Sequence, residues 1–431
     1  MPMLQCVLLQ AVASGAAPSS RFLCRCGRRA AVFHIQTGSN FSEEMQVGTD
    51  KPEKKATKQK ASAKPEEKAP EKQGVQISCS RGLSSWMERT NLSFGFTSYQ
   101  SGRLYLIGRL PKGRVSFHER HFLHAMGVAA TPQRLYLATQ YQIWRLENVL
   151  RPGQLSDGFD RNFVPRNAQT TGDLDAHEIG VEKSGRVIFV NTKYSCLSAF
   201  SLTHSFKPLW KPPFISRLAP EDRCHLNGLA MEEGEAAYVT AVCKSDIITG
   251  WRDRRASGGC IMDVRSNAMV TEDLSMPHSP RVHNGQLWVL DSGRGRLCRV
   301  DRQTGKPEPV AFLPGFARGL AFHGHYALIG LSLPRDGSFS GLELDSELAK
   351  RDAEPWCGVQ VVDLRNGDIV EWIRLSGDVR ELFDVFVLPG VKCPKATGLL
   401  DGSIRSEISI ENGAPAIARE EKPVAVAAAG A

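Results

Sequence analysis

The sequence predicts an all-β fold, a six-bladed β-propeller, and three observations lead to this prediction. Short strand patterns rich in β-branched and aromatic residues recur along the chain, whereas helical periodicity is nearly absent. A four-residue motif recurs beside these patterns, at intervals of 38 to 66 residues. Strand repeats of about 40–50 residues are typical of propeller blades.

The strand patterns come in pairs. The first members, such as RLYLAT and QLWVLDS, lie at 103–109, 134–139, 186–192, 236–242, 286–292 and 326–332. Second members follow five of them, at 142–149, 196–202, 260–265, 297–301 and 359–364. Each pair therefore predicts part of one blade.

The motif copies number the blades. They read HAMG (124–127), HEIG (177–180), HLNG (225–228), HSPR (278–281), FARG (316–319) and LFDV (382–385). The sixth copy lacks strands after it, while strands at 92–120 lack a motif before them. We therefore expect a strand at 381–388 to complete the blade that begins near residue 92, which leaves the ring without free sheet edges. The segment 334–356 interrupts the repeat and predicts a loop on one face. A β-sandwich, the alternative, would need shorter and more even turn spacing.

The chain divides into four segments with different compositions. The predicted propeller spans 85–395, within a chain of 431 residues that is 42% hydrophobic. Residues 1–49 form a disordered or targeting extension, because 1–42 hold four arginines and no acid, as organellar transit peptides do. Residues 50–84 predict a linker rich in Lys, Glu, Pro and Ala, and 396–431 predict a disordered tail.

The charge distribution argues against a nucleic-acid partner. The formal net charge is +8, but the first 74 residues carry +5 of it. Basic and acidic residues alternate in the rest without a stripe, whereas nucleic-acid-binding folds concentrate basic residues on one face. No apolar run reaches the roughly 20 residues that span a bilayer, so we expect no membrane partner. We expect a monomer.

The cysteines indicate a reducing compartment. The chain has eleven, an odd number, and most are scattered singly within apolar strand patterns. Free cysteine behaves there as a small hydrophobic residue. We therefore expect an intracellular, cytoplasmic protein, with organellar targeting by residues 1–42 as the alternative.

Four motif copies begin with histidine, and these residues predict an axial site. The innermost strands of a propeller surround one axis, so residues in equivalent positions would form a ring. Converging neutral imidazoles bind zinc, iron or copper, so a divalent metal is expected on the candidate ligands. These are His124, His177, His225 and His278.

Other polar residues share the predicted face, because side chains two apart on a strand point the same way. Asp175 and Asp384 are candidate catalytic carboxylates, and Asn227 and Arg318 are candidate ligand-binding residues. The structural alternative is that these groups line the channel and bond only to one another and to water. The basic segment 251–255 either lines an anion-binding loop or is a solvated loop between blades.

Several longer segments resemble one bacterial family. They include FGFTSYQSGRLYLIG (94–108), TGDLDAHEIG (171–180), MPHSPRVHNGQLWVLDSG (276–293) and CGVQVVDLRNGDIV (357–370). The resemblance covers roughly 92–392, to a conserved, uncharacterised family of propeller-like proteins, some fused to tetratricopeptide repeats. It implies a propeller body and no particular reaction, and the fusions imply tetratricopeptide-type protein partners.

The sequence supports three functional hypotheses. The first is a propeller that binds a peptide or a small polar molecule at a histidine-rich axial site, with or without a metal. The second is a metal-dependent lyase or hydrolase at that site, in which the metal activates water or a carbonyl. The third is a non-catalytic scaffold for protein interactions. Whether the protein is an enzyme is left open.

Overall fold

The computed structural model describes residues 23–26, 29–32, 74–400 and 402–411. The chain divides into two compact units, Met1–Ala69 and Pro70–Ala431. In the first unit, β1 (Leu23–Cys26) pairs antiparallel with β2 (Arg29–Val32). Most of the predicted extension and linker, and residues 412–431 of the predicted tail, lie outside the described residues.

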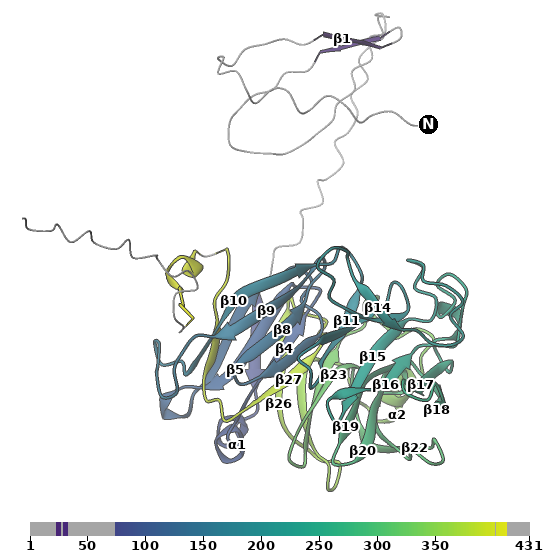
Figure 1. Ribbon diagram of the computed structural model, residues 1–431. Coiled ribbons are helices and arrows are strands. Elements are labelled where there is room, and N and C mark those ends of the chain that lie inside the picture. Colours follow the sequence, from purple (N-terminus) through teal and green to yellow (C-terminus); the bar gives the residue numbers. More distant parts are fainter. Residues whose placement is uncertain (1–22, 27–28, 33–73, 401, 412–431) are drawn as a thin grey trace, which may run out of the picture. The chain divides into compact units, whose positions relative to one another are not determined.

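The second unit is a six-bladed β-propeller (Figure 1), which confirms the predicted fold class. Each blade contains four consecutive strands of an antiparallel meander, numbered here from the axis outward. Blades 1 to 3 consist of β27 (Val385–Pro389), β4 (Leu92–Ser98), β5 (Arg103–Arg109) and β6 (Val115–His121); β7 (Val128–Thr131), β8 (Arg134–Ala138), β9 (Gln142–Asn148) and β10 (Arg161–Thr170); and β11 (Ala176–Val181), β12 (Val187–Asn191), β13 (Cys196–Ala199) and β14 (Lys207–Trp210).

The remaining blades follow the same plan. Blades 4 to 6 consist of β15 (Leu226–Glu232), β16 (Glu235–Ala241), β17 (Gly259–Asp263) and β18 (Met269–Leu274); β19 (Pro277–His283), β20 (Gln286–Asp291), β21 (Arg296–Val300) and β22 (Pro307–Phe312); and β23 (Phe316–His323), β24 (Tyr326–Ser332), β25 (Cys357–Asp363) and β26 (Ile369–Gly377).

The ring closes as the sequence predicts. Strand β27 follows the sixth blade in the chain, yet it pairs with β4 from the start of the propeller, with Val385 opposite Phe96. The two strands lie side by side at the centre of the ring (Figure 1). The C-terminal part of the chain thus supplies the innermost strand of the first blade, and it places Phe383 and Asp384 on the axis.

The ordered body is longer than the predicted 85–395. Strand β3 (Val75–Cys79) adds to the outer edge of β26, and β28 (Pro394–Ala396) adds in parallel to the outer edge of β10. Helix α1 (Leu83–Thr90) buries Leu83, Trp86 and Met87 in the core cluster that contains β4 residues. The propeller therefore takes in residues 75–84, which composition had assigned to the linker.

The glycines of the motif explain how tightly the blades approach. A Cβ atom on Gly127 would lie 2.1 Å from the carbonyl oxygen of His177 in the next blade. On Gly228 it would lie 2.2 Å from the Cδ of Pro280, again in the next blade. Any side chain at these two positions would push neighbouring blades apart, so the motif glycines are requirements of packing.

Hydroxyl groups also join neighbouring blades. The side chains of Thr97, Thr192 and Ser292 donate to backbone carbonyls of the next blade at 2.6–2.7 Å. Apolar side chains fill the space between the sheets around these bonds. The inner ends of the strands are therefore held at fixed positions around the axis.

Two further findings bear on the sequence predictions. The eight cysteines in the described part of the chain are free, and seven of them are buried. Burial raises the pKa of Cys196 to about 11, as expected for a thiol that packs as an apolar side chain. In the same part of the chain, no helix has the length and apolarity needed to cross a membrane.

Candidate functional site: an axial cavity

A cavity of about 550 Å³ opens on the axis where the innermost strands begin. Its volume is in the range of small-molecule sites. All six blades contribute to its wall, in chain order through Tyr99, His124, Asp175, His225, Met276 and Phe316. A single ligand in this cavity would therefore touch the whole ring.

The cavity gathers five of the eight predicted site residues. These are His124, Asp175, His177, His225 and Arg318. The other three, Asn227, His278 and Asp384, are buried behind or below the cavity wall and do not line it. The predicted set is thus split between a ligand-accessible surface and the interior of the propeller.

The four histidines do not share one register, contrary to the sequence prediction. The first residue of β11, β15 and β19 pairs in each case with the last residue of the neighbouring strand: Ala176 with Asn191, Leu226 with Ala241, and Pro277 with Asp291. The second residues, His177, Asn227 and His278, are therefore equivalent. His225 lies one residue before its strand, at the same level as Asp175. Aligning the motif by its first letter placed His225 two positions out of register.

The level that contains Asp175 and His225 has an unusual backbone. Asp175, His225 and Met276 directly precede the innermost strands with φ of 51°, 49° and 48°, and His124 has φ 49°. These four residues are 51, 50 and 51 positions apart. The left-handed conformation is uncommon for residues other than glycine, and Asp and His are among those that tolerate it best. Such backbone strain concentrates at functional sites.

His177 presents a lone pair to the cavity. Its Nδ1 donates to the carbonyl oxygen of Asp175 at 3.0 Å and contacts the hydroxyl of Thr192 at 2.8 Å. A carbonyl can only accept, so the proton is on Nδ1 and Nε2 is unprotonated. Burial, together with the nearby His225 and Arg318, lowers the pKa of His177 to about 4, so the ring is neutral at physiological pH.

His225 is oriented by a carboxylate. Its Nδ1 lies 3.0 Å from Oδ2 of Asp222, which also accepts from Nε1 of Trp251 at 2.8 Å. The ring lies on Trp251 with centroids 4.4 Å apart and meets His177 edge-on at 5.0 Å. The carboxylate holds the proton on Nδ1, so Nε2 of His225 is also an acceptor. Asp222 and Trp251 were not among the predicted site residues, although Trp251 begins the basic segment that was considered as an anion-binding loop.

The two other histidines take different positions. Nδ1 of His278 donates to the carbonyl oxygen of Met276 at 2.8 Å, and its Nε2 is buried without a partner among the described residues. Burial lowers the pKa of His278 well below its ordinary value. His124 is exposed at the cavity rim, where its ring stands edge-on to Tyr99 at 6.3 Å.

The predicted metal finds no matching ligand set. In the part of the chain that the structure describes, no group of three or more His, Cys, Asp and Glu side chains is placed to hold a metal ion. The imidazoles lie on two levels, and His278 is outside the cavity wall. A zinc, iron or copper ion at the axis remains a prediction, which elemental analysis of the purified protein would test.

Arg318 is a cation without a counter-charge. It makes no hydrogen bond or ion pair with any described residue, and its Nε is buried without a partner. Three aromatic rings surround the guanidinium, with Cζ 5.4 Å from Phe383, 5.5 Å from Phe316 and 5.8 Å from Tyr99. Cation–π contacts of this kind hold an arginine in place while leaving its N–H groups available.

Asp175 is a carboxylate without a cation in contact. Its side chain is 43% exposed to the cavity, and its only ionic neighbour within 4 Å in the described chain is the neutral His177, at 3.5 Å. Burial opposes ionisation, but His177, His225 and Arg318 outweigh it and hold the pKa of Asp175 below its usual value. The neighbouring Asp173, by contrast, is paired with Lys193 at 3.1 Å.

Below the cavity, the axis holds polar groups that are fully engaged. Arg281 lies 2.9 Å from Glu178 and 3.6 Å from Asp384, and it also donates to a backbone carbonyl. The two oxygens of Asp384 accept from the amides of Val128 and Val385 at 2.8 Å. Burial and the charge of Glu178 raise the pKa of Asp384 to about 7 against the effect of Arg281. Glu178 and Arg281 were missed as site residues, although both belong to the motif.

Asn227 has a similar joining role. Its Nδ2 donates to the carbonyl oxygen of Pro277 in the next blade at 2.9 Å, and its Oδ1 accepts from Thr240 at 2.7 Å. It is 2% exposed. The contacts of Asn227 and Asp384 link blades, and neither side chain reaches the cavity.

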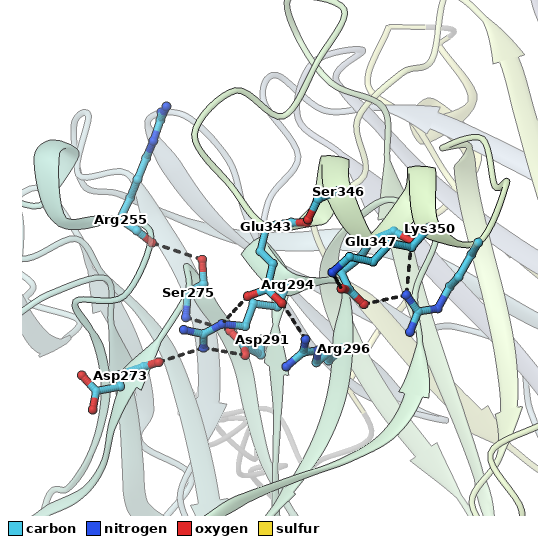
Figure 2. A network of polar contacts seen from close by, with 11 residues as sticks. Arg255, Asp273, Ser275, Asp291, Arg294, Arg296, Glu343, Ser346, Glu347 and Lys350 are labelled. Atoms are coloured by element: carbon cyan, nitrogen blue, oxygen red, sulfur yellow. Dashed lines mark hydrogen bonds and ion pairs between the residues drawn. The ribbon is translucent and has the colours of Figure 1, made fainter.

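The predicted loop at 334–356 covers one side of the cavity and contains helix α2 (Leu344–Lys350). Figure 2 shows how it is fastened to blade 5: Glu343 pairs with Arg294 at 3.2 Å and with Arg296 at 2.7 Å. Arg255, from the basic segment at the rim, donates to the carbonyl oxygen of Ser340 at 2.6 Å. The cover is therefore fixed to the ring at two places.

The fold and the cavity define a β-propeller with a polar site on its axis. Residues 81–397 match the family described as a domain of unknown function (DUF4915), so the chain belongs to that family. No curated protein matches the chain. Among solved structures, a chain of the crystal structure of a nidogen/laminin complex is similar over 70% of this chain and all of its own length, with 10% sequence identity and a TM-score of 0.45.

Proposed function

We propose that the protein binds a small molecule or a peptide end that carries a carboxylate, in the axial cavity, with Arg318 as the main anchor. The observation that carries the proposal is the unpaired Arg318 guanidinium facing a cavity of about 550 Å³. A buried charge without a partner is costly, so folded proteins rarely keep one without a use. A carboxylate would accept two parallel hydrogen bonds from the guanidinium.

The walls of the cavity suit such a ligand. Phe316, Phe383 and Trp251 supply apolar and aromatic surface, and the polar groups are few and separate. Binding sites for small molecules combine such walls with a small number of placed polar groups. The fixed cover at 334–342 limits the length of the ligand on one side.

A titration of single carboxylates tests the proposal. Isothermal titration calorimetry of the full chain with acetate, succinate, benzoate and a set of N-acetyl amino acids should reveal binding by at least one of them. We expect Arg318→Gln to weaken that binding at least tenfold and Arg318→Lys to restore part of it, since lysine keeps the charge but not the planar fork. Arg299→Gln is the matched control, because Arg299 is exposed and paired with Glu308 at 2.7 Å.

Two results would contradict the proposal. One is that none of the carboxylates binds the wild-type chain. The other is that Arg318→Gln binds them as tightly as Arg299→Gln does.

A second candidate function, acid–base turnover of the bound molecule, is favoured by the Asp222–His225 pair. An imidazole whose Nδ1 faces a carboxylate can take a proton at Nε2, since the carboxylate stabilises the imidazolium that forms. In this second function, Asp222→Asn abolishes turnover of a bound carboxylate while leaving its affinity within about threefold, because the change reaches the ligand only through His225. Equal losses of affinity and turnover would count against it.

A further inference from the structure

We infer that the ligand is a zwitterion the size of a free amino acid, whose carboxylate binds Arg318 and whose ammonium group binds Asp175, His177 and His225. This inference rests on the proposed function and names its ligand class. The cavity holds one unpaired cation, Arg318, and one carboxylate without a cation in contact, Asp175, and the two make no ion pair with each other.

The acceptor side of the cavity matches an ammonium group. Nδ1 of His177 and Nδ1 of His225 are both committed as donors, to a backbone carbonyl and to Asp222. Both Nε2 atoms are therefore acceptors, and neither has a partner in the described chain. With the Asp175 carboxylate they make three acceptors, the number of N–H donors that a primary ammonium group carries.

The electrostatics favour a cation at this end. The lowered pKa values of His177 and Asp175 keep the first neutral and the second ionised at physiological pH. The acceptor side thus carries a net negative charge that no arginine or lysine contacts directly. An ammonium group would gain a charge-assisted bond there that a neutral amide could not.

The spacing between the two ends sets the size of the ligand. The ring of Phe383 lies 5.4 Å from Cζ of Arg318 and 5.0 Å from the centre of the His177 ring. The donor and acceptor sides are thus separated by one aromatic ring. A short aminocarboxylate spans such a gap, whereas the two termini of a long peptide would not meet there.

The test separates the ammonium from the carboxylate. The full chain is titrated by calorimetry with each of the twenty proteinogenic amino acids, β-alanine and 4-aminobutyrate, and every binder is then compared with its N-acetyl and its carboxamide derivative. We expect at least one zwitterion to bind, and both derivatives to bind at least tenfold more weakly, because each removes one charge-assisted contact.

Variants assign the two ends. Asp175→Asn should weaken the zwitterion at least tenfold and leave the affinity of the N-acetyl derivative unchanged, whereas Arg318→Gln should weaken both. Asp173→Asn is the matched control, since Asp173 is two residues away and pairs with Lys193 outside the cavity wall. Thermal melts of the free variants check that each is folded.

The outcomes distinguish the two proposals. If N-acetyl derivatives bind as tightly as the parent amino acids, the zwitterion is wrong while the carboxylate site stands. If other carboxylates bind through Arg318 but none of the zwitterions binds, the inference is also overturned. If no carboxylate of either series binds, both proposals fail.

Discussion

Two adjoining levels of the propeller axis use charge in opposite ways. In the lower level, Arg281 pairs with Glu178 and approaches Asp384, and the oxygens of Asp384 accept from two backbone amides. In the cavity level, Arg318 and Asp175 are both ionic and neither has an oppositely charged side chain in contact. The two levels lie in the same blades and differ mainly in whether the charges satisfy one another.

The difference separates structural polar groups from binding groups. Paired charges below the cavity join blades 1, 3 and 5 across the axis and so contribute to closure of the ring. Unpaired charges in the cavity contribute little to folding and are available to a ligand. Changes in the lower level should therefore affect stability, and changes in the cavity level should affect binding.

The largest expected effect concerns acid stability and His177. In the folded protein the pKa of His177 is lowered to about 4, whereas the unfolded chain takes up a proton near the ordinary value of 6.5. Between these values the unfolded state binds more protons, so the free energy of unfolding decreases as the pH falls from 6.5 to 4. The shift corresponds to about 3 kcal/mol.

Urea denaturation at several pH values measures this effect. His177→Gln should lose about 3 kcal/mol of the decrease between pH 6.5 and pH 4. His204→Gln, at an exposed site, is the control and should keep the wild-type slope. An unchanged slope in His177→Gln would show that the ring is not held neutral.

A smaller effect is expected at Asp384. Asparagine has one acceptor oxygen, so Asp384→Asn leaves either the Val128 or the Val385 amide facing an NH₂ group and removes a charge near Arg281. An unsatisfied buried donor costs about 1–3 kcal/mol. The free energy of unfolding from urea titration at pH 8 should fall by this amount, and ligand affinity should not change. Asp378→Asn, at an exposed position, should leave both quantities unchanged.

The sequence was sufficient for the fold and for part of the site. Alternating apolar patterns and the recurring motif predicted the blades, the strand at 381–388 that closes the ring, and the candidate residues Arg318 and His177. These features depend on local periodicity, which a single sequence displays directly. Whether the four histidines share one register depends on strand pairing, and the similarity of HLNG to HEIG concealed the offset of His225.

The missed residues have partners that are distant in the chain. Arg281 meets Glu178 from two blades away and Asp384 from the opposite end of the propeller sequence. The loop that carries Trp251 is positioned by Asp222, which also orients His225. Such contacts depend on the curvature of the ring, so no spacing in the sequence indicates them. One signal was present, because Glu178 and Arg281 are charged residues at inner positions of the motif.

The comparison of the two levels is tested most directly by their two arginines. The free energies of unfolding of the wild type, Arg281→Gln and Arg318→Gln are measured by urea denaturation without added ligand. Arg281→Gln should lose about 3–5 kcal/mol, since it leaves the buried Glu178 and Asp384 without their cation. Arg318→Gln should remain within about 0.5 kcal/mol of the wild type, because no described side chain depends on its charge. Equal losses in the two variants would contradict the assignment of the cavity level to binding.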